Sequence, residues 1–176
     1  MQVVSIADHA FRELGLTSVS MPNGIASIGY AAFYDNLLTN IEIPDSVTSI
    51  GDYAFAANGL LSSVVLPNNL ASIGRSTFYD NALSSIDIPG SVTSIGAYAF
   101  RGNKLTSISI PHNVTSIGDY AFAANGLLSS ASFLGDRPNL NVGPFVNDPL
   151  LATVTACTGK SGWPGEPISN GTSDLI

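Results

Sequence analysis

The sequence predicts a repeat solenoid, in which the chain coils into stacked turns of short parallel strands joined by turns or 3-10 segments, with little long helix. Three patterns support this prediction, and they share one period. An apolar residue followed by proline closes successive segments, a Ser-Ile-Gly triplet recurs between them, and a phenylalanine follows each triplet. The phenylalanines, spaced by 22 or 23 residues, are Phe11, Phe33, Phe55, Phe78, Phe100 and Phe122. A fixed period between about 20 and 50 residues is typical of stacked repeats.

The repeat with the clearest pattern spans residues 105–126 and reads LTSISIPHNVTSIGDYAFAANG. Ile108 and Ile110 alternate with serines, which predicts a strand with one buried face. Pro111 ends this strand because proline lacks a backbone donor. A second inward-facing run then ends at Ile117. Each repeat should therefore contain two short extended segments.

The corner after the second run is expected to hold the large core side chain of each repeat. Gly118 permits a sharp bend, and Asp119 is placed where its side chain could cap a short helical turn at Tyr120–Phe122. We interpret every repeated Phe as core, because one turn cannot bury its apolar side alone and stacking buries it instead. An asparagine follows each Phe by three residues, and such a column satisfies backbone groups in turns. These asparagines are Asn36, Asn58, Asn81, Asn103 and Asn125.

The order L-x-x-I-x-I, proline, I-G-x-x-A-F and then Asn resembles the BspA-like leucine-rich repeats of bacterial surface and secreted proteins. The resemblance covers residues 2 to about 134. It implies a leucine-rich-repeat right-handed superhelix with a strand ladder along its concave face. It also implies a place at the cell surface or outside the cell, and a role in adhesion or in binding host or matrix molecules.

We expect three segments along the chain: residues 1–134 as the solenoid of about six repeats, residues 135–168 as a degenerate last repeat with a C-terminal cap, and residues 169–176 as a loose tail. In the second segment, we interpret Phe145 as the equivalent of the repeated Phe in a degenerate last repeat. Residues 152–156 are interpreted as a final strand, and Trp163 as a lid over the core. The chain begins inside a repeat, so we interpret it as a fragment of a longer protein.

The first repeat is open, because no layer precedes it. Its apolar residues Val3, Ile6 and Phe11 are therefore expected to have no preceding layer, and Leu14 stands where later repeats have Asn. An uncovered apolar end predicts either weak end-to-end self-association or weak order before about residue 15.

The composition excludes several classes of partner. Only 11% of the 176 residues are charged, the net charge is −7, and no basic run occurs, so nucleic acid and anionic membranes are poor partners. No apolar stretch reaches the ~18 residues of a transmembrane helix, so membrane insertion is not expected. Cys157 is the sole cysteine, which excludes an intramolecular disulfide, and no metal-ligand spacing accompanies it. We expect no metal and no other cofactor.

The candidate binding residues are the outward positions of the strands that end in proline. In a leucine-rich solenoid these positions repeat in register, so they form one extended strip. The strip consists of Asn40, Glu42, Ser63, Val65, Ser85, Asp87, Ser107 and Ser109. An apolar Val65 between two acids favours a peptide with a basic residue on either side of a hydrophobic one, or a glycan held by hydroxyls. The residues after each proline, such as Asp45 and Asn68, are expected to form its rim.

Glu42 and Asp87 raise the question of carboxylate-pair catalysis. Two turns of a parallel ladder separate their backbones by about 10 Å, which is near the ~6.5–9.5 Å of an inverting glycosidase pair and too wide for joint metal binding. A general acid, however, needs a pKa raised by burial or by a close like charge, and an open strip provides neither. We therefore expect no catalytic residues and no enzyme activity.

Two functions remain open on the sequence. One is a non-catalytic interaction module that binds a protein or glycan on another cell or on the matrix through the strand face. The alternative is a structural spacer without a ligand of its own, whose polar positions only keep the sheet soluble. The variety of Glu42, Val65 and Asp87 among serines favours binding, since a spacer should show interchangeable residues. A tyrosine lies two residues before or one residue after five of the repeated Phe residues, and we interpret this change of place as packing compensation on the convex side, with an aromatic binding patch as the other interpretation.

Overall fold

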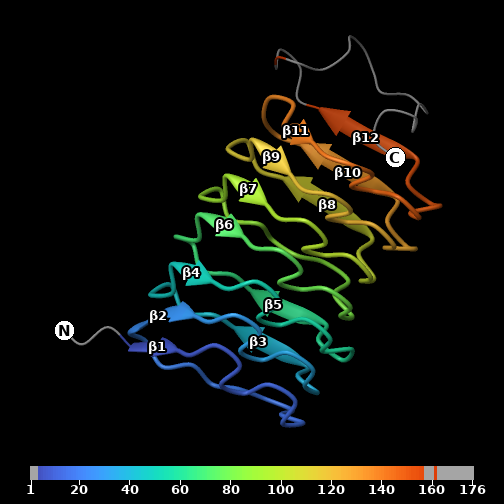
Figure 1. The fold of residues 1–176 in the computed structure, drawn as a ribbon. Helices are drawn as coiled ribbons and strands as arrows, with labels where there is room; N and C mark the ends of the chain where they lie inside the picture. The colour runs from blue at the N-terminus through green and yellow to red at the C-terminus, as the bar shows by residue number, and fades with distance from the viewer. Residues whose placement is uncertain (1–3, 157–160, 162–176) are drawn as a thin grey trace.

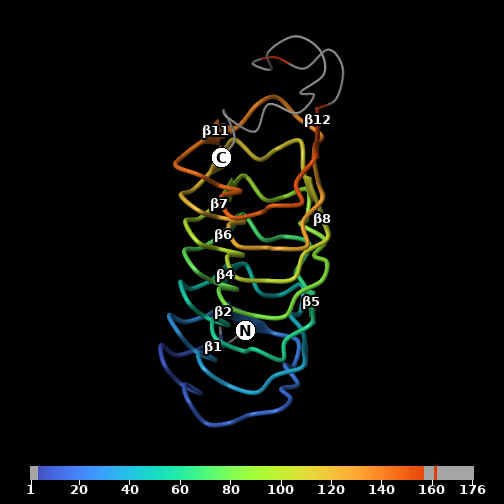
Figure 2. The same ribbon diagram turned by 90° about the vertical axis from the view of Figure 1, so that its right-hand side faces the viewer.

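The computed structural model describes residues 4–156 and residue 161 and shows a parallel β-solenoid of about seven turns (Figure 1). The turns lie stacked as coils along one axis (Figure 2). A first strand face carries β1 (Val4–Ile6), β2 (Ile25–Ile28), β4 (Ser49–Ile50), β6 (Ser72–Ile73), β7 (Ser94–Ile95), β9 (Ser116–Ile117) and β11 (Asn139–Leu140). A second face carries β3 (Asn40–Glu42), β5 (Ser63–Val65), β8 (Ser107–Ile110), β10 (Ser130–Phe133) and β12 (Thr153–Ala156). These features confirm the predicted fold class.

The described residues contain no helix, and hence none long and apolar enough to cross a membrane. The predictions for Cys157, for Trp163 as a lid and for the tail at 169–176 lie outside the described residues.

On the first face, the Ser-Ile part of each triplet forms the strand and the glycine follows it. Parallel pairing places identical residues of successive turns opposite each other, so that Ser94 lies opposite Ser116 and Ile95 opposite Ile117. The turns approach closely at the glycines, since a Cβ added to Gly118 would lie 2.4 Å from the backbone nitrogen of Ala97 in the preceding turn. The triplet therefore ends in glycine because the spacing of the turns leaves no room for a side chain.

On the second face, the alternation seen in the sequence becomes an alternation of exposed and buried side chains. Ser107 and Ser109 of β8 are exposed, whereas Ile108 and Ile110 are buried. β10 pairs in parallel with both β8 and β12, which places Ser132 opposite Ser109. The final strand expected at residues 152–156 is β12.

The corner that joins the two faces is not helical, so the helical turn predicted at Tyr120–Phe122 is wrong. Tyr120 adopts a left-handed φ of 55°, and the N–H of Phe122 donates to the carbonyl of Pro144 in the next turn at 2.8 Å. Asp119 does not cap its own turn, because its Oδ1 accepts from the N–H of Val142 in the next turn at 2.9 Å. Two left-handed residues, Tyr120 and Ala124, lie on either side of Phe122, and the N–H groups of all three donate to carbonyls of the next turn. The corners thereby form a third ladder of backbone hydrogen bonds.

The repeated phenylalanines form one continuous column through this corner. Adjacent rings are nearly parallel, with centroids 5.2 to 5.7 Å apart and interplanar angles of 4° to 10°. Phe145 stacks on Phe122 at the C-terminal end, and Phe11 stacks on Phe33 at the N-terminal end. All of these rings are buried except that of Phe11, which is 39% exposed. The prediction that the repeated Phe residues are core is confirmed for Phe33, Phe55, Phe78, Phe100 and Phe122, and it is wrong for Phe11, because no layer covers its ring among the described residues.

The asparagine column lies beside the phenylalanines and is buried as well. The Nδ2 of Asn103 donates to the carbonyls of Phe78 at 2.8 Å and Phe100 at 3.0 Å, and its Oδ1 accepts from the N–H of Leu83 at 3.0 Å. Buried backbone groups need such partners. The asparagines therefore have the structural role that their spacing predicts.

The N-terminal turn is described from Val4 onward, and β1 pairs in parallel with β2. Val4, Phe11 and Leu14 are 52%, 39% and 60% exposed, respectively. The described N-terminal turn thus shows the exposed apolar side chains on which the prediction of self-association depends.

Candidate functional site

The structure places all eight residues of the predicted strip on the second strand face, and all are exposed. They come from β3, β5, the segment at residues 85–87, and β8. Pairing of β3 with β5 sets Asn40 opposite Ser63 and Glu42 opposite Val65. The neighbours Ile41, Val64, Ile86 and Ile108 are buried and anchor the strip to the core.

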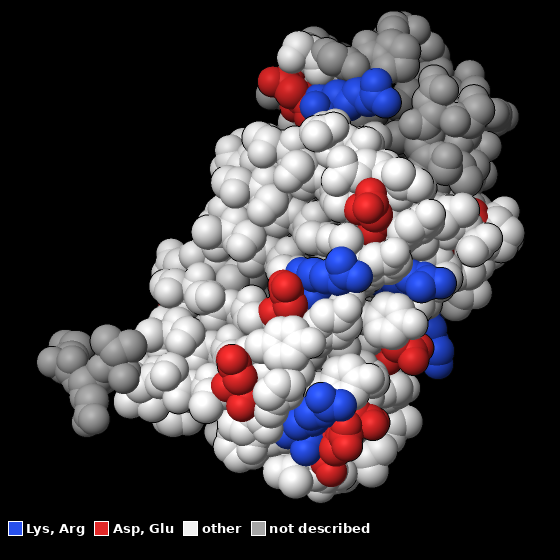
Figure 3. All heavy atoms as spheres, in the orientation of Figure 1, with Lys and Arg blue, Asp and Glu red and all other residues white. Residues whose placement is uncertain are grey.

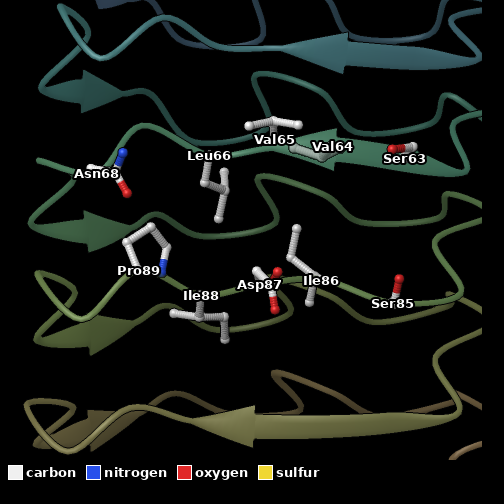
Figure 4. A pocket seen from close by; sticks show the side chains of 10 residues that line it. All are labelled: Ser63, Val64, Val65, Leu66, Asn68, Ser85, Ile86, Asp87, Ile88 and Pro89. Atoms are coloured by element: carbon white, nitrogen blue, oxygen red, sulfur yellow. The ribbon is translucent and has the colours of Figure 1, made fainter.

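Two adjacent hollows lie along this strip. The larger, about 780 Å³, is lined by Asn40, Glu42 and Val65 of the strip, and also by rim and N-terminal residues that include Met21, Asp45 and Asn68. The smaller, about 460 Å³, is lined by Ser63, Val65, Ser85 and Asp87 together with Asn68 and Pro89. Figure 4 shows the side chains of the smaller hollow coming from two turns, one above the other. Val65, Leu66 and Asn68 line both hollows, so the two form one continuous open depression.

The second strand face is interrupted where the smaller hollow lies. The hydrogen-bonded ladder stops at β5 and resumes at β8. Within the described part of the chain, residues 85–88 make no backbone–backbone hydrogen bond to either neighbouring turn. Ile86 and Ile88 are 8% and 9% exposed, whereas Ile108 and Ile110 are 3% and 1% exposed. The interruption leaves unpaired backbone donors and acceptors beside Val65 and Asp87.

The depression is acidic. Glu42, Asp45 and Asp87 line it, and neither hollow is lined by Lys, Arg or His. Asp45 also orders the rim, since its Oδ1 accepts from the backbone N–H of Asn68 at 2.8 Å. Val65, which is 55% exposed, supplies an apolar surface between these carboxylates.

The structure divides the predicted strip into two parts. Asn40, Glu42, Ser63, Val65, Ser85 and Asp87 line the depression, whereas Ser107 and Ser109 line neither hollow. The rim residues Asp45 and Asn68 join the depression, as their position after each proline indicates. The sequence does not predict the interruption at residues 85–88, because the segment has the same pattern as every other strand that ends in an apolar residue and proline.

No group of three or more metal-ligating side chains occurs among the residues that the structure describes. Glu42 and Asp87 line different hollows. Neither carboxylate is buried. Glu42 and Asp87 thus do not form an enclosed carboxylate pair.

The corner carries a second surface ladder, made of tyrosines and arginines. Tyr98 stacks on Tyr120 with centroids 5.4 Å apart, and the guanidinium of Arg75 lies 5.3 Å from the centroid of Tyr98. Where Ser76 replaces a tyrosine, Nε of Arg75 donates to the hydroxyl of Tyr53 at 3.2 Å. Arginine therefore fills the gap in the aromatic ladder. Figure 3 shows basic and acidic side chains interspersed on the face it presents, without a large patch of one sign.

A family model described as the BspA type leucine-rich repeat region matches residues 1–103 and 49–158, with six copies. Among curated proteins, no relative of the chain is found.

Solved structures with the same fold come from several bacteria. A leucine-rich repeat protein from Bacteroides ovatus is 25% identical, with a TM-score of 0.66, and the match covers 86% of this chain and 46% of that protein. A leucine-rich cell surface protein from Faecalibacterium prausnitzii is 29% identical, with a TM-score of 0.58 and coverage of 73% and 42%. The leucine-rich repeat protein of T. pallidum is 26% identical, with a TM-score of 0.71 and coverage of 85% and 72%. The chain thus spans less than half the length of the first two.

Proposed function

Because this chain belongs to the BspA-type leucine-rich repeat family, we propose that it is a non-catalytic interaction module whose binding site is the acidic depression on the second strand face. The observation that carries the proposal is the depression itself: two joined hollows that share Val65 and carry Glu42, Asp45 and Asp87. The family includes bacterial surface proteins, since the relative from F. prausnitzii is described as a cell surface protein. A location at the cell surface or outside the cell is part of the proposal.

The chemistry of the depression favours a polypeptide partner that carries basic residues on either side of an apolar one. Val65 offers an apolar contact at the centre, and the carboxylates on both sides attract Lys or Arg. The unpaired backbone groups of residues 85–88 add donors and acceptors that an extended peptide can reach. A glycan would use the serine hydroxyls and would depend less on the two acids.

The affinity of one module is expected to be modest, because the depression is open and polar. Interface residues at the rim of such a surface each contribute little, and most binding energy comes from a few buried contacts. Display of many modules on one surface raises the overall binding strength through avidity.

A non-catalytic role agrees with the family, because repeat proteins of this type are generally non-catalytic. It also agrees with the open surroundings of Glu42 and Asp87, both of which are exposed. A carboxyl group on an open surface lacks the desolvation that gives a general acid its raised pKa.

The experiment compares two double variants with the same change in net charge. Glu42→Gln with Asp87→Asn removes two charges from the depression, and Ser49→Lys with Ser72→Lys adds two positive charges on the exposed positions of the opposite face. Binding is measured against a library of basic and apolar peptides and against a glycan array. We expect at least a tenfold loss of peptide affinity for the first variant only.

Equal losses in both variants would show that net charge, not the depression, governs binding. Binding of the unmodified chain to the glycan array, without any peptide binding, would identify a glycan as the partner. No binding by the unmodified chain to cells, matrix proteins, peptides or glycans would favour the spacer function.

A further inference from the structure

Asp148 occupies the next position of the buried asparagine column. It lies three residues after Phe145, as Asn125 lies three residues after Phe122. The side chain is buried, with 8% of its surface exposed, and Phe145 continues the ring column beside it. The last repeat therefore has a carboxyl group where the preceding repeats have a carboxamide.

Asn58 and Asn81 provide a matched template for this position, because their repeat has the same extra residue as that of Asn125 and Asp148. The backbone N–H of Asn58 donates to Oδ1 of Asn81 at 2.9 Å, and Nδ2 of Asn81 donates to the carbonyl of Phe55 at 3.1 Å. In the last repeat, the N–H of Asn125 donates to Oδ1 of Asp148 at 2.6 Å. One half of the template is thus reproduced.

The other half is not reproduced. Oδ2 of Asp148, the atom that replaces the donor nitrogen of the template, is buried and has no hydrogen-bond partner. In the template, the equivalent atom of Asn81 donates to the carbonyl of Phe55, so Oδ2 of Asp148 would face the carbonyl of Phe122. That carbonyl already accepts from Nδ2 of Asn125. An ionised carboxylate can only accept hydrogen bonds, whereas a protonated carboxyl group has one O–H donor.

We propose that Asp148 acts as the asparagine of the last repeat only while it is protonated, and that its ionisation loosens the C-terminal end of the solenoid. The proton supplies the missing donor toward the carbonyl of Phe122. Loss of the proton sets a buried negative charge beside a carbonyl oxygen. The affected region is the packing of Asn125, Leu128 and Leu151 and the pairing of β10 with β12.

Burial raises the pKa of Asp148 from 3.8 to about 7, against the lowering effect of the Asn125 N–H. Among the described residues, no titratable or charged side chain contributes to this shift, and the nearby apolar residues Phe145 and Leu151, three positions before and after Asp148, belong to the hydrophobic core. The folded pKa lies above the unfolded one, so the folded state holds the proton more tightly. The stabilisation is therefore complete below about pH 4, is lost as the pH rises toward 7, and stays lost above it.

The test uses amide hydrogen exchange at pH 5 and pH 8.5, corrected for intrinsic rates, on three chains. In the unmodified chain we expect the protection of the Asn125 amide and of β10 and β12 to fall at least tenfold between the two pH values. Asp148→Asn should abolish this fall, because the carboxamide restores the template at every pH. The matched control Asn81→Asp should create a similar fall at the amide of Asn58.

Two outcomes would overturn the proposal. One is a fall in protection that persists unchanged in Asp148→Asn. The other is a carbon NMR titration in which the Asp148 carboxyl group has the pKa of an exposed aspartate, while Asp148→Asn folds normally. Asp148→Asn is expected to fold, since its geometry is that of Asn81 in the same chain.

Discussion

Asn103 donates from its side chain to the backbone carbonyl of Phe78, a residue of the preceding turn, at 2.8 Å. The same carboxamide also bonds Phe100 in its own turn and accepts from Leu83, so one side chain joins two turns through three backbone groups. The backbone partners are the carbonyls and amides that the corner cannot satisfy within itself. The asparagine column is thus the polar counterpart of the phenylalanine column.

Replacement of this side chain should be costly. Asn103→Ala leaves Leu83 N–H and Phe78 C=O unsatisfied in a buried position, whereas Phe100 C=O keeps its hydrogen bond from Nδ2 of Asn125 at 3.1 Å. Each unsatisfied buried group costs about 1–3 kcal/mol. We expect a loss of roughly 3 kcal/mol or more in the free energy of unfolding, measured by urea denaturation. Asn113→Ala is the control, because Asn113 donates to Gly90 at an exposed site. Similar losses for both variants would contradict the role of the column.

The phenylalanine column should show a similar contrast between its centre and its end. Phe78→Ala or Phe100→Ala removes a fully buried ring that is stacked on both sides, so we expect a loss of roughly 3–5 kcal/mol. Phe11→Ala removes a ring that is 39% exposed and stacked on one side, and should cost clearly less. A loss below about 1 kcal/mol for Phe78→Ala would refute its assignment to the core.

The glycine of the triplet gives a prediction about spacing. A Cβ on Gly118 would lie 2.4 Å from Ala97 N and 2.7 Å from Gly96 C, and these backbone atoms cannot move aside without separating two turns. Overpacking of this kind costs about 1–3 kcal/mol, and we expect Gly118→Ala to be at the upper end. Gly126→Ala is the control, because a Cβ there has no neighbour within 4 Å. Thermal unfolding of the two variants distinguishes a steric cause from a general effect of removing glycine.

The sequence predicts the parts of this fold that depend on period and polarity. The repeat length fixes which residues stack, so Phe78, Phe100 and Asn103 could be placed before any coordinates were known. The same register places Glu42 opposite Val65. The corner could not be predicted in this way, because Tyr120 is not a residue that favours a left-handed φ, and only the hydrogen bonds to the next turn explain it.

The candidate site was less predictable for a related reason. Whether the ladder is hydrogen-bonded at residues 85–88 depends on small shifts between turns, which leave no signal in the residue pattern. Asp148, in contrast, is visible in the sequence three residues after Phe145, where it replaces the expected asparagine. Its missing hydrogen bond becomes clear only when the burial and the template at Asn81 are known.

The N-terminal turn gives a prediction about association. In each later turn, three corner carbonyls accept hydrogen bonds from N–H groups of the preceding turn. The equivalent carbonyls of the first turn are those of Asp8, Ala10 and Arg12, and among the described residues no hydrogen bond reaches them. Two copies that meet through this end would place carbonyls against carbonyls. Exposed apolar side chains must then supply the attraction, so the contact should be weak.

Leu14, which is 60% exposed, is the side chain to change. Sedimentation velocity over a range of concentrations should show weak self-association of the unmodified chain, and Leu14→Asp should reduce it. Leu60→Asp is the matched control, because Leu60 is 55% exposed but lies in a middle turn. If Leu60→Asp reduced association as much as Leu14→Asp, the contact would involve the side of the solenoid. If the unmodified chain were monomeric at all concentrations, association through this end would be excluded.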